Sequence, residues 1–405
     1  MFKKEKIKLG PKIRPDRQKV RYFDHAATTY LAPRVVKAME PYWSEKFGNP
    51  SALYAKGREA KAAIDQARAQ VAQIFNCSPG EIIFEGSGTE SDNHALIGTA
   101  LANKARGNHI ITSTIEHHAV LHALGFLETQ GFEVTYLPVD RDGLIKLAEL
   151  EKAIRPETIL VSIMLANNEI GTVQPIKEIS AVIKSAGQPI MFHTDACQAA
   201  GFYELDVASL GVDLMTVNGS KIYGPKGTGV LYVKKGTAIQ PYIHGGGQEN
   251  GRRAGTENVA GIVGLATALE LVQAEKEQEN ERLLKLRSKL IDGLLKIPKV
   301  VLNGHPEKRL PNNVNVTIKD IEGEAMLLHL DEYGIAASTG SACTSGSLEP
   351  SHVILALGHP YEMAHGSIRF SLGHSNTAAD IDFLLKVFPP IIEKLRAMSP
   401  VKLGE

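Results

Sequence analysis

The sequence has few cysteines and no long apolar run. Its 3 cysteines, Cys77, Cys197 and Cys343, are far apart and odd in number. That spacing argues against a disulfide framework and for a reducing compartment, which we expect to be the cytoplasm. No CxxC pair or His/Cys cluster has the spacing of metal ligands, so we expect no structural metal. No apolar run approaches the ~20 residues that span a bilayer, so we expect no membrane partner.

The sequence also lacks an excess of charge of either sign. Lys and Arg number 45 and Asp and Glu number 45, which gives a formal net charge of +0. No global field therefore favours nucleic acid or an anionic membrane, and we expect neither as a partner. Residues 1–20 are basic but lack the apolar stretch of a secretory signal, so we interpret them as a solvated tail.

What the sequence does have is a large apolar fraction arranged in alternating segments. Hydrophobic residues make up 43% of the 405 residues, enough for a large core and about two domains. Short β-branched runs alternate with amphipathic helical stretches, which predicts an α/β domain with a mainly parallel sheet of about seven strands, covered on both faces. The seven runs are residues 82–86, 109–114, 133–139, 158–166, 190–196, 214–219 and 229–233.

The pattern changes near residue 265. A long, charged, helix-forming run at 266–297 predicts a connecting helix, and mixed helices and strands follow it. These later segments predict a second, smaller α+β domain. The predicted boundaries are 26–270 for the large domain, and 1–25 with 271–405 for the small one.

Three predicted strands are followed by residues that could bind a ligand. In an open α/β sheet, ligands bind at the carboxyl ends of the strands. The stretch GSGTES (86–91) combines glycines, hydroxyls and a helix start, which suits a phosphate. Asp195 could pair with a cationic ring nitrogen, and Lys221 could be a nucleophilic amine that forms a Schiff base.

Each of these features has a commonplace alternative. The first stretch and Asp195 could be ordinary helix caps, and Lys221 could be a surface lysine whose stem packs on the protein. Together, however, a phosphate cradle, a carboxylate and a Schiff-base lysine are the three attachments of pyridoxal phosphate. Their combination at three strand ends favours the functional interpretation.

Several long motifs make the sequence recognisable over nearly its whole length, from residue 22 to residue 373. They are GTESDN, TIEHHAV, ANNEIGTVQP, HTDACQ, GSKIYGPKGTG, GGGQENGRRAGTEN, STGSACTSGSLEP and SIRFSLG. With them, the sequence resembles the class V aminotransferases, a family of fold-type I pyridoxal-phosphate enzymes. Within that family it is similar to the cysteine desulfurases of the NifS/IscS type.

The resemblance implies roles for residues around the cofactor ring. Lys221 would form the Schiff base with pyridoxal 5'-phosphate, and Asp195 would pair with the pyridine nitrogen. His117 would stack on the ring and help to move protons. Asn168 and Gln198 would flank the ring's substituents, with Asn168 also contacting substrate.

The resemblance also implies how phosphate and substrate are bound. Gly88, Thr89 and Ser220 would hold the phosphate. Thr256 would reach the phosphate of a partner subunit, which implies a homodimer with active sites at its interface. Arg369 would bind the substrate carboxylate through its planar guanidinium.

Cys343 decides between the reactions that such a cofactor permits. It lies in ASTGSACTSGSLEP (337–350), among small residues that cannot form a core, so we expect an exposed and mobile thiol. The alternative is a small buried hydrophobic residue. By resemblance, Cys343 would take sulfur from L-cysteine as a persulfide, releasing L-alanine. An iron–sulfur scaffold or a tRNA-thiolation carrier would then accept the sulfur.

Other functions remain open on the same sequence. A selenocysteine lyase or a cystine/cysteine lyase would use the same fold and cofactor, but would have less need of the Cys343 segment. A binding or scaffolding protein, with chemistry secondary, belongs to a different class. It is disfavoured because Lys221, Asp195 and Arg369 are all present.

Overall fold

The computed structural model describes residues 20–340 and 349–399. Its main feature is one sheet of seven strands, in which β8 alone runs antiparallel to its neighbours. The predicted, mainly parallel seven-stranded sheet is therefore confirmed. In spatial order the strands are β2 (Ile82–Glu85), β8 (Gly229–Val233), β7 (Leu214–Asn218), β6 (Met191–Asp195), β5 (Thr158–Ser162), β3 (His109–Ser113) and β4 (Glu133–Leu137).

Both faces of this sheet are buried because alternate strand residues point into different cores. Ile111 and Val161 pack on the side of α3 (Ala55–Phe75), α8 (Ile176–Ser185) and α10 (Val259–Leu294). Their neighbours Ile110 and Leu160 pack on the opposite side, with α6 (His118–Thr129). This two-sided burial explains why the strands read as nearly continuous apolar runs.

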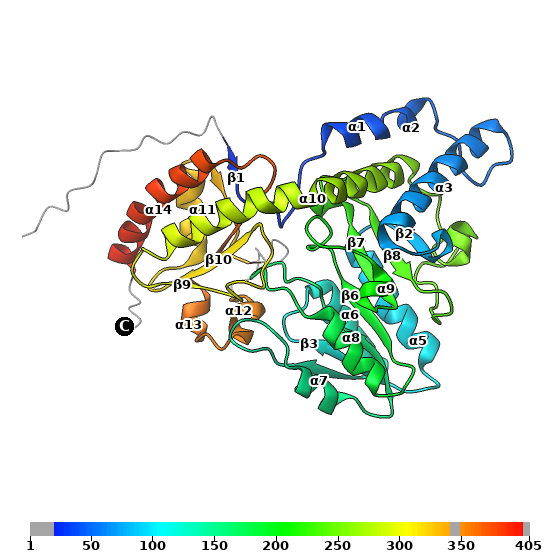
Figure 1. Cartoon of the computed structure of the whole chain (residues 1–405), viewed down its shortest axis with the longest axis horizontal. Helices are drawn as coiled ribbons and strands as arrows, with labels where there is room; N and C mark the ends of the chain where they lie inside the picture. The colour runs from blue at the N-terminus through cyan, green and yellow to red at the C-terminus, as the bar shows by residue number, and fades with distance from the viewer. Residues whose placement is uncertain (1–19, 341–348, 400–405) are drawn as a thin grey trace, which may run out of the picture.

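The long helix α10 links the large sheet to the C-terminal part of the chain (Figure 1). It begins at a cap in which Asn258 Oδ1 accepts a hydrogen bond from Gly261 N at 3.0 Å. Its first half packs against α1 and α3, and its second half packs against β10 and α14. The predicted connecting helix is confirmed, although it starts earlier than the sequence pattern suggested.

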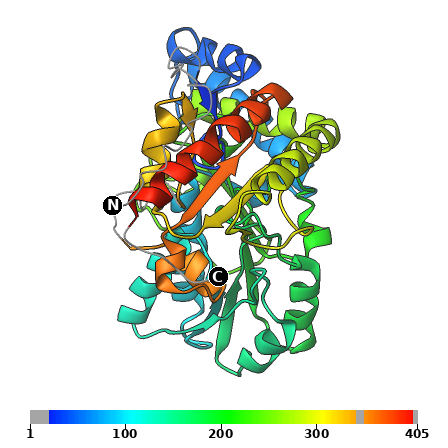
Figure 2. The ribbon, with the colours of Figure 1, turned by 90° about the vertical axis from the view of Figure 1, so that its left-hand side faces the viewer.

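The strands that follow α10 in the chain form a second, smaller sheet, which Figure 2 shows from its own side of the molecule. It is antiparallel and has a separate core, into which Phe23 from the N-terminal segment packs. The domain boundaries at residues 26 and 270 stay a prediction. The elements here are β9 (Val300–Leu302), β10 (Asn313–Ile318), β12 (Ser367–Ser371), α11 (Gly323–Asp331), α14 (Ala378–Met398), and the parallel pair β1 (Arg21–Tyr22) and β11 (Ile335–Ala336).

The remaining elements are short connectors and surface helices. They are α1 (Pro33–Met39), α2 (Pro41–Ser44), α4 (Gly88–Asn93), α5 (Thr99–Asn103), α7 (Leu147–Ala153), α9 (Val207–Leu210), α12 (His352–Ala356), α13 (Tyr361–Ala364), the π-helix η2 (His94–Gly98), and the 3₁₀ turns η1 (Pro79–Glu81), η3 (Gly219–Lys221) and η4 (Gln248–Gly251). Along the described parts of the chain, no helix combines the length and apolar character needed to cross a membrane.

Candidate active site

A cavity opens at the carboxyl ends of the parallel strands, where an α/β sheet places its ligands. We call it the central cavity. It brings together most of the residues that were predicted to hold a cofactor. Its lining residues are Gly88, Thr89, Asp92, His117, Met164, Asn168, Asp195, Cys197, Gln198 and Asn218.

Asp195 is the last residue of β6, which lies between β5 and β7 inside the sheet. Its carboxylate is fixed by a local turn, because Oδ1 accepts a hydrogen bond from Cys197 N at 2.8 Å. Asp195 is 7% exposed and lines the central cavity. A buried anion that faces a cavity in this way can pair with a cationic ring nitrogen.

Lys221 follows β7 through the 3₁₀ turn η3. Asn218 starts this turn, since its Oδ1 accepts hydrogen bonds from Ser220 N at 2.8 Å and Ser220 Oγ at 2.9 Å. The turn points Lys221 Nζ at the carbonyl oxygens of Ala26 and Ala27, at 3.0 and 2.6 Å. The lysine is therefore held by two neutral acceptors on the first loop of the chain.

A small second cavity lies beside Lys221. Gln198 lines both this cavity and the central one, so the amine lies next to the central cavity. Gln198 Nε2 donates to Ala26 O at 3.0 Å, the same carbonyl that Lys221 contacts.

The predicted phosphate cradle follows β2 at the start of the helical segment that begins with α4. Ser87 caps this helix, with its Oγ accepting from Glu90 N at 3.0 Å. A Cβ on Gly88 would lie 3.0 Å from Cys197 Sγ and 3.2 Å from Asn218 Cβ. Glycine therefore keeps this part of the cavity open, and the helix start with Thr89 suits an anion.

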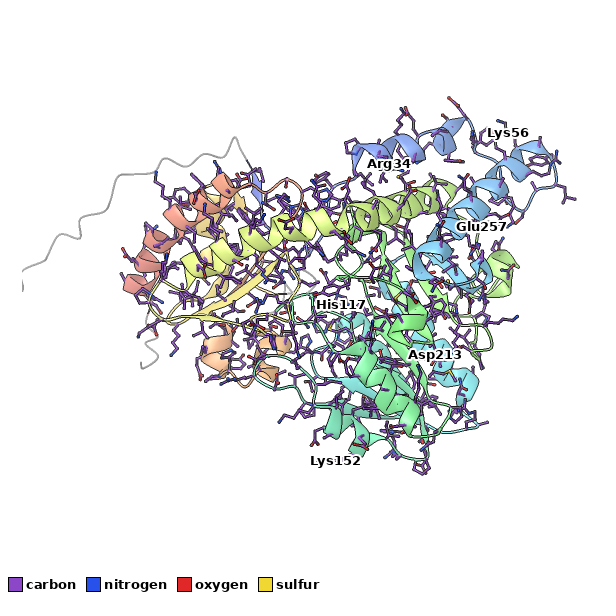
Figure 3. The ribbon with its side chains drawn as sticks, in the orientation of Figure 1. Arg34, Lys56, His117, Lys152, Asp213 and Glu257 are labelled. Atoms are coloured by element: carbon purple, nitrogen blue, oxygen red, sulfur yellow. The ribbon has the colours of Figure 1, made fainter. Side chains whose placement is uncertain are left out.

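His117 lines the central cavity from the loop that follows β3. It caps α6, because its Nδ1 accepts a hydrogen bond from Ala119 N at 3.1 Å. In the neutral imidazole the proton then lies on Nε2. Figure 3 labels His117 near the middle of the molecule, whereas Lys56 and Lys152 lie at its periphery.

Asn218 was not among the predicted site residues. Its side chain lines the central cavity beside Gly88, whereas Ser220 directs its hydroxyl to Asn218. The sequence could have indicated this turn, because an Asn that ends a strand before a Gly commonly accepts a hydrogen bond from the backbone two residues later. Asp92 was also missed, although it lines the same cavity and is 1% exposed.

Arg369 lies in β12 of the small sheet and is 1% exposed. Its Nη1 donates to Asn168 O at 2.9 Å, and Nη2 donates to Asp24 Oδ1 at 2.7 Å. Through Asn168, which lines the central cavity, the guanidinium lies just behind that cavity.

Asp24 is a site residue that sequence reasoning missed. Burial raises the pKa of this carboxyl, and the Arg369 and Lys221 cations oppose the rise. Asp24 therefore lies within the electrostatic reach of both predicted cationic residues of the site. Its place in the stretch YFDHAATT (22–29), where the family resemblance begins, was the available signal.

The structure separates Thr256 from the central cavity of its own chain. Thr256 is exposed on the loop between β8 and α10.

Of the three cysteines, Cys343 lies outside the described residues. Of the other two cysteines, burial raises the pKa of Cys77 to about 12 and raises that of Cys197 well above its usual value. Both are therefore neutral thiols near pH 7.

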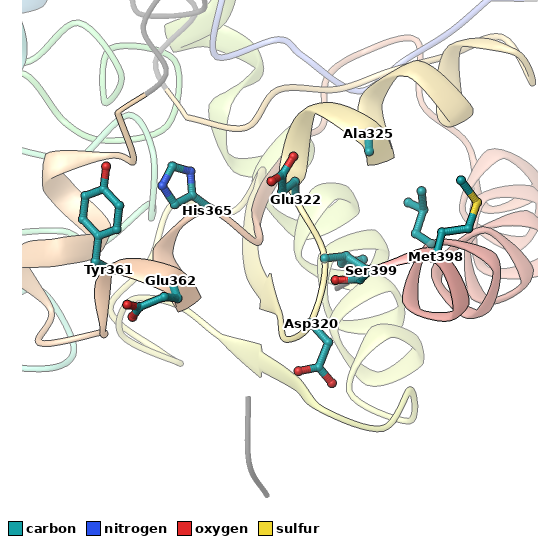
Figure 4. A pocket seen from close by; sticks show the side chains of 10 residues that line it. Asp320, Glu322, Ala325, Tyr361, Glu362, His365, Met398 and Ser399 are labelled. Carbon is teal, nitrogen blue, oxygen red and sulfur yellow. The ribbon is translucent and has the colours of Figure 1, made fainter. Parts of the chain in front are cut away.

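Another cavity, of about 370 Å³, lies in the small-sheet region and is shown in Figure 4. Carboxylates of Asp320, Glu322 and Glu362 surround it, together with Tyr361 and His365. It contains none of the predicted site residues. The central cavity is therefore the candidate active site.

The fold and much of the sequence are shared with known proteins. The aminotransferase class-V family matches residues 21–384. The chain is 58% identical over 380 residues to a protein named cysteine desulfurase IscS from Methanosarcina thermophila, covering 94% of each chain.

Two solved structures resemble the chain closely. A structure titled NifS-like protein has a TM-score of 0.88 at 40% identity, covering 93% of this chain and 100% of that one. A structure titled SspA in complex with cysteine has a TM-score of 0.76 at 38% identity, covering 87% of this chain and 98% of that one.

These observations define a fold-type I enzyme with a ligand site at the carboxyl edge of its large sheet. The chain belongs to the aminotransferase class-V family. Enzymes of this family use pyridoxal 5'-phosphate, and the residues present fit that cofactor. The open cradle at Gly88, the buried Asp195 carboxylate and the adjoining Lys221 amine match its phosphate, ring nitrogen and aldehyde.

Proposed function

We propose that this protein is a cysteine desulfurase, which converts L-cysteine to L-alanine and keeps the sulfur as a persulfide on Cys343. The observation that carries the proposal is that Asp195 and the Gly88 cradle line the central cavity, with Lys221 beside it and Arg369 directly behind it. The 58% identity to a protein named as a cysteine desulfurase supports the choice of reaction.

The roles proposed for the cofactor-binding residues follow from their positions, except that of Ser220, which rests on the family resemblance alone because its hydroxyl donates to Asn218. Gly88, Thr89 and Ser220 would hold the phosphate, and Asp195 would pair with the pyridine nitrogen. His117 would stack on the ring. Bound pyridoxal phosphate supplies an electron sink for the charge that develops at the substrate Cα. Cα becomes acidic for that reason.

The residues beside and behind the central cavity would act on the substrate. Arg369 would bind the carboxylate of L-cysteine, with Asn168 beside it, and so fix the position of Cα. Lys221 Nζ would then take the Cα proton as a general base. Its carbonyl partners on Ala26 and Ala27 would hold the resulting ammonium, and Gln198 would keep the Ala26 carbonyl in place.

Sulfur transfer needs a thiolate, and we assign that role to Cys343. Its sulfur would attack the substrate Sγ, forming an S–S bond while the C–S bond breaks. The electron pair would pass to the carbon skeleton, which takes a proton and leaves as alanine. Cys77 and Cys197 are poor candidates because burial raises the pKa of both thiols.

A homodimer would complete the site. Thr256 is exposed, as expected for a residue that reaches the phosphate of a partner subunit. An open groove of about 480 Å³ borders the cradle and is lined by Thr89, His117, Phe126 and Tyr242 among others. Phe126 and Tyr242 are 48% and 40% exposed, which suits an interface between two copies.

The acceptor of the sulfur would be a protein of iron–sulfur cluster assembly or tRNA thiolation, with the cytoplasm as the site of action. A selenocysteine lyase or a cystine/cysteine lyase is the second candidate, because it would use the same cavity and cofactor. The relative solved with cysteine favours L-cysteine over selenocysteine as the substrate.

The test measures sulfide and alanine formed from L-cysteine in the presence of a reductant. Wild type should form both products in equal amounts. Cys343→Ala should lose this activity and still bind pyridoxal phosphate, whereas Cys77→Ala, the matched control, should behave like wild type. A Cys343→Ala variant as fast as wild type would contradict the persulfide step and favour a lyase that eliminates directly.

A further inference from the structure

The loop that carries Thr256 is unusually well anchored for a glycine-rich segment. We call residues 244–258, HGGGQENGRRAGTEN, the glycine-rich loop. Such a composition predicts conformational freedom. In the structure, however, charged side chains tie this loop to other parts of the chain. Arg252 Nη2 donates to Gly80 O at 2.7 Å, and the contacts of Glu249 and Arg253 anchor the loop on either side of it.

The first anchor is Glu249, which is 6% exposed. Arg68 of α3 donates to both of its oxygens, with Nη2 at 2.6 Å from Oε1 and Nη1 at 2.8 Å from Oε2. Phe84 N, on the end strand β2, donates to Oε2 at 3.0 Å. A buried carboxylate with three donors fixes its own backbone firmly.

The backbone at this anchor is strained. Glu249 has φ 49° and ψ 38°, and Asn250 has φ 58° and ψ 36°, so both are left-handed. Such conformations are unfavourable for residues that carry a side chain, and they persist only where the surroundings determine them. Here the Arg68 and Phe84 contacts of the Glu249 carboxylate hold the conformation in place.

The second anchor is Arg253, which ties the loop to the chain's own phosphate cradle. Its Nε donates to Glu90 Oε1 at 2.7 Å, and Nη2 donates to Glu90 Oε2 at 3.3 Å. Glu90 lies in the first turn of α4, beside Thr89, and its Oε2 accepts from Gly86 N at 2.9 Å. The loop and the cradle therefore lie side by side on one face of the molecule.

This adjacency is what a two-fold dimer requires. In a symmetric dimer, Thr256 can reach the partner's cradle only if Thr256 of the partner subunit reaches the cradle of this chain. The loop and the cradle must then belong to the same interface. The Arg253–Glu90 pair brings them together, and Thr256 follows Arg253 by three positions at an exposed site.

We propose that Glu249 is a positioning residue for the cofactor site of the partner subunit. Its carboxylate sets the left-handed backbone that presents Thr256 across the dimer interface to the phosphate of the second copy. This inference rests on the homodimer and on the role of Thr256 in the proposed function. It adds that the presentation is built by a buried ion pair with Arg68.

The first experiment measures the affinity of the cofactor-free protein for pyridoxal phosphate. Glu249→Ala should lower this affinity about tenfold or more, because one phosphate contact is lost at each site. The protein should remain a dimer by sedimentation. Glu270→Ala, which removes one partner of the exposed Arg34–Glu270 ion pair, is the matched control and should bind like wild type. Unchanged affinity in Glu249→Ala would overturn the proposal, as would a monomeric wild type.

The second experiment asks whether Glu249 acts across the interface. In mixed dimers, one subunit carries Lys221→Ala and an intact loop, and the other carries Glu249→Ala and an intact Lys221. Borohydride then traps the cofactor only on Lys221. The site with Lys221 should bind with wild-type affinity, because its Thr256 comes from the intact loop. A defect that persists would show that Glu249 acts only within its own subunit and would overturn the proposal.

These binding measurements separate the inference from the proposed reaction. A wild type that binds the cofactor normally but releases no alanine from L-cysteine would contradict the desulfurase proposal. The mixed dimers would still test whether Glu249 acts on the cofactor site of the partner subunit.

Discussion

The two sides of the central cavity are built in different ways. On the large-sheet side, Asp195, His117 and Asn218 are each fixed by a hydrogen bond to a backbone N–H two residues away. On the small-sheet side, Arg369 depends on Asp24, 345 residues away, and on Asn168, 201 residues away. These three residues of the cavity are thus placed by local turns, whereas the residue that we propose to bind the substrate is placed by tertiary folding.

This difference predicts separable functions. Damage to the small-sheet side should impair substrate recognition and leave cofactor binding intact. Damage to the large-sheet side should impair the cofactor site first. The following variants test that separation.

The largest effect is expected at Lys221. Lys221→Ala removes the amine that would bind the cofactor covalently, so the visible absorption band of the lysine-bound cofactor should disappear and activity should be abolished. Pyridoxal phosphate should still bind, because the Gly88 cradle and Asp195 remain. Lys226→Ala, an exposed lysine five residues later, is the matched control. A retained covalent band in Lys221→Ala would contradict the assignment.

The next largest effect is expected at Arg369. Arg369→Lys keeps the charge but loses the planar fork, so kcat/KM for L-cysteine should fall about 100-fold, mostly through KM. Cofactor affinity, measured by absorbance titration, should stay within about twofold of wild type. An equal loss of cofactor affinity would show that the two sides of the cavity are not separable.

A smaller effect is expected at Asp24. Asp24→Asn can still accept a hydrogen bond from Arg369 Nη2 but loses the ionic contribution, so kcat/KM should fall about tenfold. Steady-state kinetics with L-cysteine and with cysteamine, which lacks the carboxylate, would show whether the loss of activity depends on the substrate carboxylate. If Asp24 acts through Arg369, only the L-cysteine reaction should respond. An equal fall with both substrates would contradict that role.

The smallest effect is expected at Glu85, below the cradle on the large-sheet side. Burial raises the pKa of this carboxyl to about 10, so the folded protein keeps it protonated. As pH rises above the ordinary value of 4.5, the unfolded chain loses the proton and the folded state loses relative stability. Glu85→Gln removes this penalty.

The corresponding measurement is the free energy of unfolding at pH 5 and pH 8. The advantage of Glu85→Gln over wild type should grow by roughly 1–3 kcal/mol between these values. Equal stability differences at both pH values would mean that Glu85 is ionised in the folded protein.

Much of the fold could be predicted because each element has its own signal in a short stretch of sequence. Each of the seven strands is a short apolar run that ends in turn-forming residues, and the helices between them have a different period. The same local signals indicated Gly88, Asp195 and Lys221, because each lies at the end of a strand or shortly after it. The long helix α10 could be predicted from its charged composition with few helix-breaking residues.

The rest depended on contacts between distant segments. No pattern within the sequence pairs Asp24 with Arg369, since tertiary folding alone brings these residues together. The cavity-facing role of Asn218, rather than Ser220, depends on how one 3₁₀ turn directs its side chains. The roles of Thr256 and Cys343 stay predictions, because one awaits a partner subunit and the other lies outside the described residues.

The central claim is that sulfur from L-cysteine ends on Cys343. The most direct test is a single turnover with L-cysteine in the absence of reductant, followed by proteolysis and mass spectrometry of the cysteine-containing peptides. The peptide that carries Cys343 should gain one sulfur atom, and the peptides with Cys77 or Cys197 should gain none. Sulfur on either of those two cysteines, or sulfide released with Cys343 unmodified, would contradict it.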